Sequence, residues 1–284
     1  MTSRTGSGTS SVATREAEFL PVRRQYPENS VRLLVRNTLV QTKRILTRWA
    51  RDLVTVLEAL VLPILMMLTL NIVLGHLIYA ATKDSALYSI VALIALGGAI
   101  SGSTFAALDL IRERSSGLLS RLWVLPVHRA SGVLSRIVAE AARIVVTTVV
   151  MLGAGVILGF RFRQGVIAIL MWISVPVIFG MAFAALITTV ALYTAKTLVV
   201  EAVELVTLVL IFFSTGLFPV HQYPGWVQPV VAHQPVSYAV AAMRGLSAGG
   251  PVLAPMIATL LWSAGIAAAC VVPMAIGYRR ASTH

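Results

Sequence analysis

The chain has 284 residues, of which 57% are hydrophobic and only 12% charged, and its net charge is +12. A soluble domain carries roughly a quarter charged residues, so this composition excludes an ordinary soluble protein and indicates an integral membrane protein. The basic residues stand at the ends of apolar runs and do not form one patch interleaved with aromatic residues, which argues against a nucleic-acid partner.

Two different segments precede the first long apolar run. Residues 1–30 are rich in serine, threonine, glycine and charge. Such a segment buries too little apolar surface to fold, so we expect a disordered cytoplasmic tail. In residues 31–52, mostly apolar residues recur at helical spacing, and the basic residues lie off that stripe. This pattern predicts an amphipathic connecting helix on the inner membrane surface. The alternative is the charged flank of the first span.

Six further runs are long enough, at about 20 residues, to cross a bilayer as helices. They cover about residues 53–75, 86–108, 138–160, 166–191, 198–219 and 253–277. No signal peptide precedes them, so we expect the N-terminus to stay inside. That orientation places nineteen of the 23 lysines and arginines on the inner side, as the positive-inside rule requires. The sequence therefore predicts an all-α, polytopic plasma-membrane protein with both termini in the cytoplasm.

One basic segment follows the second span. The stretch "IRERSSGLLSRLWVLP", residues 111–126, places Leu118, Leu122 and Leu125 on one helical stripe. Pro126 ends the helix, because a proline pushes the preceding residue towards extended geometry. A short amphipathic helix on a cytoplasmic loop suits docking into a groove of a partner. The alternative is an ordinary basic topology loop.

The segment between the fifth and sixth spans contains several prolines and no apolar run of span length. Irregular or broken-helix backbone is tolerated at membrane depth when protein surrounds it. We expect short re-entrant helices over about residues 220–245, dipping into the outer leaflet.

The motifs of several enzyme classes are missing. The sequence has no G-x-x-x-x-G-K-[ST] nucleotide-binding motif, no Cys/His cluster with metal-ligand spacing and no G-x-S-x-G elbow. We therefore assign no catalytic residue and no metal ligand. Glu58, Glu201 and Glu204 lie in or at the edge of spans, where carboxylates belong either to a proton or substrate path or to structural pairs. Both interpretations stay open.

Several strings resemble one family of permeases. The inner "RERSSGLLSRLWVLP" and the outer "STGLFP…YPGW…HQPVSYAVAAMRG" are similar to the permeases of type 2 ABC exporters (the ABC-2 family). "LTRWARD", "RLWVLPVHRASG" and "LGFRFRQG" resemble the mycobacterial Drr-type branch of C subunits, from exporters of daunorubicin and phthiocerol dimycocerosate (PDIM). Such strings cover most of the chain from about residue 33 onwards.

The resemblance implies a function. Residues 53–284 would form a six-span permease domain that is not itself an enzyme and needs no cofactor. ATP and Mg would bind to a separate ATPase subunit, present in two copies, and a second, related permease would complete a heterodimer. The cargo would be a PDIM-like complex lipid or an amphiphilic drug such as daunorubicin or doxorubicin, exported by alternating access. The alternative is an ATP-independent secondary transporter of amphiphiles, for which only Glu58 offers a coupling residue.

The resemblance also implies three groups of site residues. The first is a coupling helix on the ATPase subunit: Arg112, Glu113, Arg114, Leu118, Leu119, Arg121, Leu125 and Pro126. The second is the part of the connecting helix that touches the same subunit: Arg44, Arg48 and Trp49. The third lines the substrate path between the second and fifth spans: Ser101, Ser103, Thr104, Thr207, Phe212 and Phe213.

Overall fold

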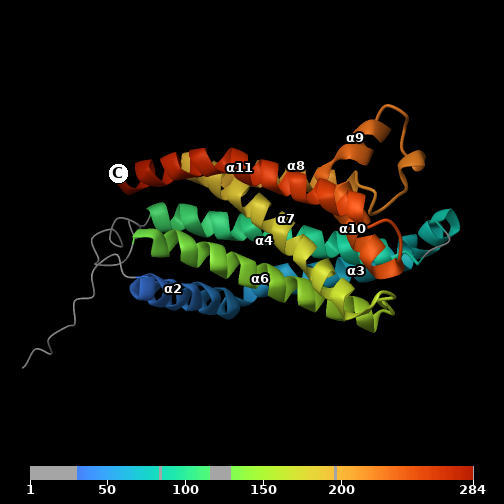
Figure 1. Cartoon of the computed structure of the whole chain (residues 1–284), viewed down its shortest axis with the longest axis horizontal. Coiled ribbons are helices and arrows are strands. Elements are labelled where there is room, and N and C mark those ends of the chain that lie inside the picture. Colours follow the sequence, from blue (N-terminus) through green and yellow to red (C-terminus); the bar gives the residue numbers. More distant parts are fainter. Residues whose placement is uncertain (1–30, 83–84, 116–128, 195–196, 284) are drawn as a thin grey trace, which may run out of the picture.

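The computed structural model describes residues 31–82, 85–115, 129–194 and 197–283, and the regular elements of these ranges are all helices (Figure 1). In chain order they are α2 (Val31–Arg51), α3 (Leu53–Thr82), α4 (Leu87–Ser115), α6 (Arg129–Ile157), α7 (Gly165–Tyr193), α8 (Thr197–Phe212), the short 3-10 helix η1 (Val220–Gln222), α9 (Gln228–His233), α10 (Pro235–Ala248) and α11 (Leu253–Thr283). The expected tail, residues 1–30, lies outside the described residues.

Within the described residues, five helices are long and apolar enough to cross a membrane. Their spans are Leu53–Gly75, Leu87–Leu108, Leu134–Ile157, Gly165–Tyr193 and Leu253–Met274. They correspond to the first four and the sixth of the spans expected from the sequence, so the all-helical, polytopic character is confirmed. The expected fifth span, residues 198–219, differs because α8 is helical for only 16 residues and ends at Phe212.

Helix α4 lies at the centre of the bundle. In the most apolar stretch of α4, 76% of the residues are buried inside the protein, whereas in that of α3 only 6% are. Helices α3, α6, α7, α8 and α10 all contact α4. Their side chains meet in one large core that includes Val91 and Leu96 of α4 and Trp172 and Phe179 of α7. Helix α4 therefore forms the core, and α3 forms part of the outer surface.

Small residues permit the closest helix contacts. A Cβ atom placed on Gly155 of α6 would lie 2.8 Å from a methyl group of Val91 on α4, and one placed on Gly180 of α7 would lie 2.9 Å from Ile144 of α6. Spanning helices associate by such close packing, since lipid supplies no hydrophobic effect between them. These glycines thus set how near α6 comes to each of its neighbours.

The segment after α8 folds back onto the bundle. Its last part, α10, packs against α4, α7 and α11, and Val236, Ala239 and Met243 are fully buried there. With 14 residues, α10 is too short to cross a bilayer. The preceding η1 and α9 project from the bundle as a loop-like cap (Figure 1), and Trp226 in that cap is 83% exposed.

The long helices run up and down the bundle. The start of α2, the end of α4, the start of α6 and the end of α11 lie at one end of the molecule (Figure 1). We call this the loop end, because residues 116–128, which are outside the described ranges, connect Ser115 to Arg129 there. The cap of η1 and α9 lies at the opposite end, which we call the cap end.

Candidate functional site: polar contacts around the central helix

Three polar residues of α4, all expected on a substrate path, lie in the half of the helix nearer the loop end. The Ser101 side chain lies next to the Glu204 carboxylate of α8. The Ser103 hydroxyl donates to Oε1 of Glu140 on α6, at 2.7 Å. Thr104 is buried, and its hydroxyl has no hydrogen-bond partner among the described residues. Two of the three side chains thus join α4 to its neighbours.

An ion pair is buried in α6 beside these residues. Arg143 donates from Nε to Oε2 of Glu140 at 3.1 Å, and from Nη2 to Oε1. Both side chains are more than nine-tenths buried, and both lie within the span Leu134–Ile157. The sequence reasoning missed this pair, because it counted Arg143 among the basic flanks of the inner loop. The signal was present as a glutamate and an arginine three residues apart within an apolar run.

The other expected path residues lie along α8. Thr207, one turn after Glu204, is buried and donates its hydroxyl to the Val203 carbonyl at 2.8 Å. Phe212 and Phe213 are half-exposed at the end of α8. Thr207 therefore lies one turn from Glu204 in the middle of α8, whereas the two phenylalanines lie at the end of the helix.

The end of α8 is stabilised by side chains from the folded-back segment. The Tyr223 hydroxyl donates to the carbonyl of Ser214 at 3.0 Å and lies 3.3 Å from that of Phe212. The buried Gln234 amide donates to the Phe213 carbonyl and, at 3.1 Å, to Ser237. Because the last carbonyls of a helix have no partner within it, these contacts supply donors that the helix itself lacks. Burial raises the pKa of Tyr223, which keeps its hydroxyl protonated and able to donate.

The connecting helix α2 lies beside the first half of α6 (Figure 1). Thr42 donates to the Ser135 carbonyl at 3.2 Å, and Gln41 contacts the hydroxyls of Ser131 and Ser135. Helix α6 starts at Arg129, so these contacts hold α2 beside the first two turns of α6. The expected ATPase contacts differ in exposure: Arg44 and Arg48 are exposed, and Trp49 is half-buried.

The two arginines belong to a basic hollow on α2. It is lined by Val40, Lys43, Arg44, Thr47, Arg48, Arg51 and Asp52. Asp52 also accepts hydrogen bonds from the backbone and hydroxyl of Thr55, at 3.4 and 2.8 Å, and so caps the start of α3. The hollow therefore presents a largely positive surface on the second half of α2.

The residues expected in the coupling helix fall in two places. Arg112, Glu113 and Arg114 belong to the last turn of α4, which continues without a break to Ser115. The remaining five lie outside the described residues: Leu118, Leu119, Arg121, Leu125 and Pro126.

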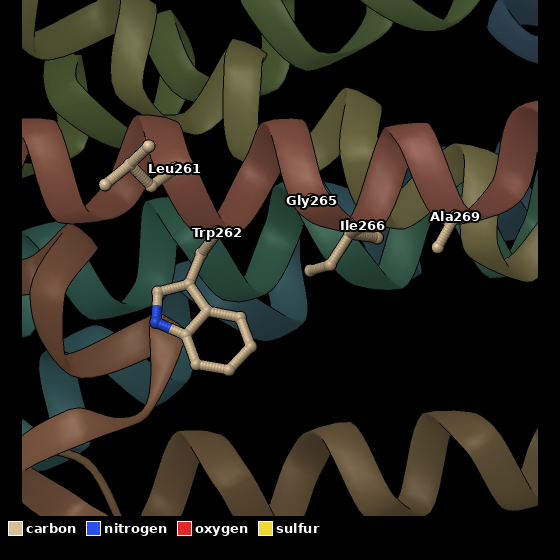
Figure 2. A pocket seen from close by; sticks show the side chains of 5 residues that line it. All are labelled: Leu261, Trp262, Gly265, Ile266 and Ala269. Carbon is tan, nitrogen blue, oxygen red and sulfur yellow. The ribbon is translucent and has the colours of Figure 1, made fainter.

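A shallow apolar hollow lies on the outer face of α11. Leu261, Trp262, Gly265, Ile266 and Ala269 line it, and the Trp262 indole projects away from the helix (Figure 2). An exposed apolar face on a spanning helix suits contact with lipid or with another spanning helix. Within the described residues, no group of three or more His, Cys, Asp or Glu side chains could hold a metal ion.

Long apolar helices packed around one buried helix, with polar contacts near its middle, define a multi-pass membrane protein. Residues 36–247 match the ABC-2 type transporter family, and the chain belongs to this family. It is 68% identical over 271 residues to the "Probable doxorubicin resistance ABC transporter permease protein DrrC" of Mycobacterium tuberculosis strains CDC 1551 / Oshkosh and ATCC 25618 / H37Rv. That similarity covers 95% of this chain and 98% of each relative.

A more distant relative is the "Daunorubicin resistance ABC transporter permease protein DrrB1" of Streptomyces coeruleorubidus, with 20% identity over 213 residues and 75% of each chain. The family resemblance expected from the sequence is thus confirmed. As an ABC-2 permease domain, the chain has no ATPase site or cofactor site, and it works with an ATPase subunit.

Proposed function

We propose that this permease exports amphiphilic drugs of the doxorubicin and daunorubicin type, driven by ATP hydrolysis in its ATPase partner. The observation that carries the proposal is the 68% identity to DrrC over nearly the full length of both chains. The spanning helices contain few charged residues, and such a lining suits a flat apolar drug better than an ion or a sugar.

We extend the proposal to a PDIM-like complex lipid as physiological cargo. The support is the similarity of the chain to the mycobacterial branch and the exposed apolar faces of α3, α8 and α11, which would let a lipid approach from the bilayer. Comparing the surface lipids of a knockout strain with those of the complemented strain tests this extension. Loss of a complex lipid supports it, and identical surface lipids contradict it.

The proposed assembly has two ATPase copies and a second, related permease. In each permease, six crossings would place both termini in the cytoplasm, with α8 and the folded-back segment forming the fifth crossing and a re-entrant part in the outer leaflet. Residues 111–126 would act as the coupling helix on the ATPase, next to Arg44, Arg48 and Trp49 of α2. Ser101, Thr207 and Phe212, with their neighbours Ser103, Thr104 and Phe213, would line the path.

The proposed mechanism is alternating access. Nucleotide closure in the ATPase would displace the coupling helix, and α4 and α6, which join it on either side, would carry that displacement into the spans. The cargo would then pass from the inner to the outer leaflet. The fixed position of α2 beside the start of α6 supports a second point of contact with the ATPase.

The test is doxorubicin uptake into inverted vesicles that contain both permeases and the ATPase. We expect ATP-dependent uptake that is abolished when the catalytic lysine of the ATPase is replaced. The Arg121→Glu permease should insert normally yet lose most of its uptake and its co-purification with the ATPase, because charge reversal disrupts a charged docking contact. Uptake that persists with the inactive ATPase would favour the secondary transporter, and wild-type co-purification of Arg121→Glu would contradict the coupling helix.

A further inference from the structure

The buried pair of Glu140 and Arg143 is costly for a spanning helix. Charged side chains inside a bilayer are expensive, and a buried ion pair adds little net stability even when it is well formed. This pair is not fully satisfied, since Nη1 of Arg143 has no hydrogen-bond partner among the described residues. Stability alone is therefore a poor explanation for it, and a role in fixing one particular arrangement of helices is a better one.

The pair is also part of the contact between α6 and α4. The Ser103 hydroxyl binds the Glu140 carboxylate at 2.7 Å. On the preceding residue, a Cβ atom at Gly102 would overlap the Arg143 guanidinium, which lies directly against the α4 backbone. A hydroxyl on one side and a glycine on the other thus seat the ion pair against a single position of α4. We call Ser103, Glu140 and Arg143 the polar clamp.

The polar clamp lies at about the same distance from the loop end along both helices. Gly102 lies 13 residues before the end of α4 at Ser115, and Arg143 lies 14 residues after the start of α6 at Arg129, so each stands about 20 Å from the loop end at 1.5 Å per residue. Apolar packing between spanning helices has no hydrophobic effect to resist sliding. A directional contact at this height therefore fixes the axial register of α4 against α6.

We propose that the polar clamp makes α4 and α6 move as one lever when the ATPase displaces the loop between them. The inference rests on the proposed function, because it takes residues 116–128 as part of the coupling element. Glu140 and Arg143 are positioning residues here, since they act through the two helices and not on the cargo, and Ser103 holds Glu140 from the α4 side. Without the polar clamp, each helix would move separately and ATP hydrolysis would lose its connection to transport.

The test compares doxorubicin transported per ATP hydrolysed in proteoliposomes. The Glu140→Gln/Arg143→Met double variant removes both charges together and so avoids leaving one of them buried alone. We expect ATPase co-purification and ATP hydrolysis close to the wild type, with the transport ratio lowered about fivefold, in the range that mutations between coupled sites produce. A merely structural role would lower the yield of complex without changing the ratio.

Two glycines provide a matched pair of controls. Gly102→Ala should lower the ratio as the double variant does, because its Cβ displaces the guanidinium, and adding it to the double variant should have little further effect. Gly98→Ala, one turn earlier on α4, should leave the ratio unchanged, since no atom lies within 4 Å of a Cβ placed there. A wild-type ratio in the double variant, or equal effects of Gly102→Ala and Gly98→Ala, would overturn the proposal.

A second readout needs no cargo. Nitroxides on cysteines at Leu108 and Leu134, in a Cys270→Ala background, report the relative position of α4 and α6. Their spin–spin broadening should be insensitive to nucleotide in the wild type and should change on nucleotide addition in the double variant. Absence of doxorubicin transport by the wild type would count against the proposed function alone, whereas nucleotide-insensitive broadening in both proteins would count against the polar clamp.

Discussion

Gln234 shows how one side chain permits a helix to end inside the protein. The residue is 5% exposed, and its amide donates to the carbonyl of Phe213, just beyond the end of α8. The same amide reaches Ser237, whose hydroxyl in turn accepts from the backbone of Thr215. A single amide therefore joins the end of α8 to the start of α10.

We predict that Gln234→Leu destabilises the permease by about 1–2 kcal/mol, because it leaves a partly buried carbonyl without its donor. The thermal unfolding of the purified protein in detergent measures the change. Gln222→Leu is the control, since Gln222 lies in the same segment but is exposed, and it should unfold close to the wild-type temperature. Equal unfolding temperatures for all three proteins would show that the Phe213 carbonyl has another donor.

At the residue scale, the sequence located polar positions but not their partners. Ser101 and Ser103 of α4 were expected to line a substrate path, whereas the structure places their side chains against α8 and α6. Predicting these neighbours requires knowing which face of α6 and which face of α8 meet α4, and that depends on tertiary packing. Likewise, the sequence could not show that Gly102 makes a close contact and Gly98, one turn earlier, does not.

At the element scale, the contact of α4 with α6 continues from the polar clamp towards the cap end. There Gly155 faces Val91, with no space for a larger side chain. We predict that Gly155→Leu costs about 1–3 kcal/mol by overpacking this contact, measured as a lower unfolding temperature. Gly153→Leu, two residues earlier on α6 where a Cβ meets no neighbouring atom within 4 Å, should be tolerated. Similar losses in both variants would mean that leucine disturbs α6 itself and not the contact.

The sequence predicted which segments form helices better than it predicted where those helices end. Apolar runs correctly marked α3, α4, α6, α7 and α11, because about 20 apolar residues in lipid have few alternatives to a helix. The end of α8 could not be predicted in this way. It depends on the contacts of Tyr223 and Gln234 with carbonyls, which link positions distant in the sequence.

At the scale of the whole molecule, the described surface is unevenly apolar. Helix α4 is enclosed by its neighbours, whereas α3, α8 and α11 expose large apolar side chains such as Leu62, Leu205 and Leu261. In a membrane such faces contact lipid or a second permease. The bundle thus has a buried centre, at α4, and an outer apolar layer available for contact with lipid or a second permease.

The number of crossings decides on which side of the membrane the chain ends. With six crossings, α2 and the end of α11 share one side, as they share one end of the bundle (Figure 1); with five, they would lie on opposite sides. The chain contains one cysteine, Cys270, so a Cys270→Ala background allows single cysteines to be labelled individually.

We predict that an impermeant maleimide added to intact cells labels Trp226→Cys, because this residue is 83% exposed at the cap end. Arg44→Cys on α2 and Ser282→Cys at the end of α11 should be labelled only after permeabilisation, because the excess of lysine and arginine on that side holds it in the cytoplasm. Labelling is read by the mass shift of the purified protein. Modification of Ser282→Cys in intact cells would imply an odd number of crossings. Modification of Arg44→Cys but not of Trp226→Cys in intact cells would mean that the orientation is the reverse of the one predicted.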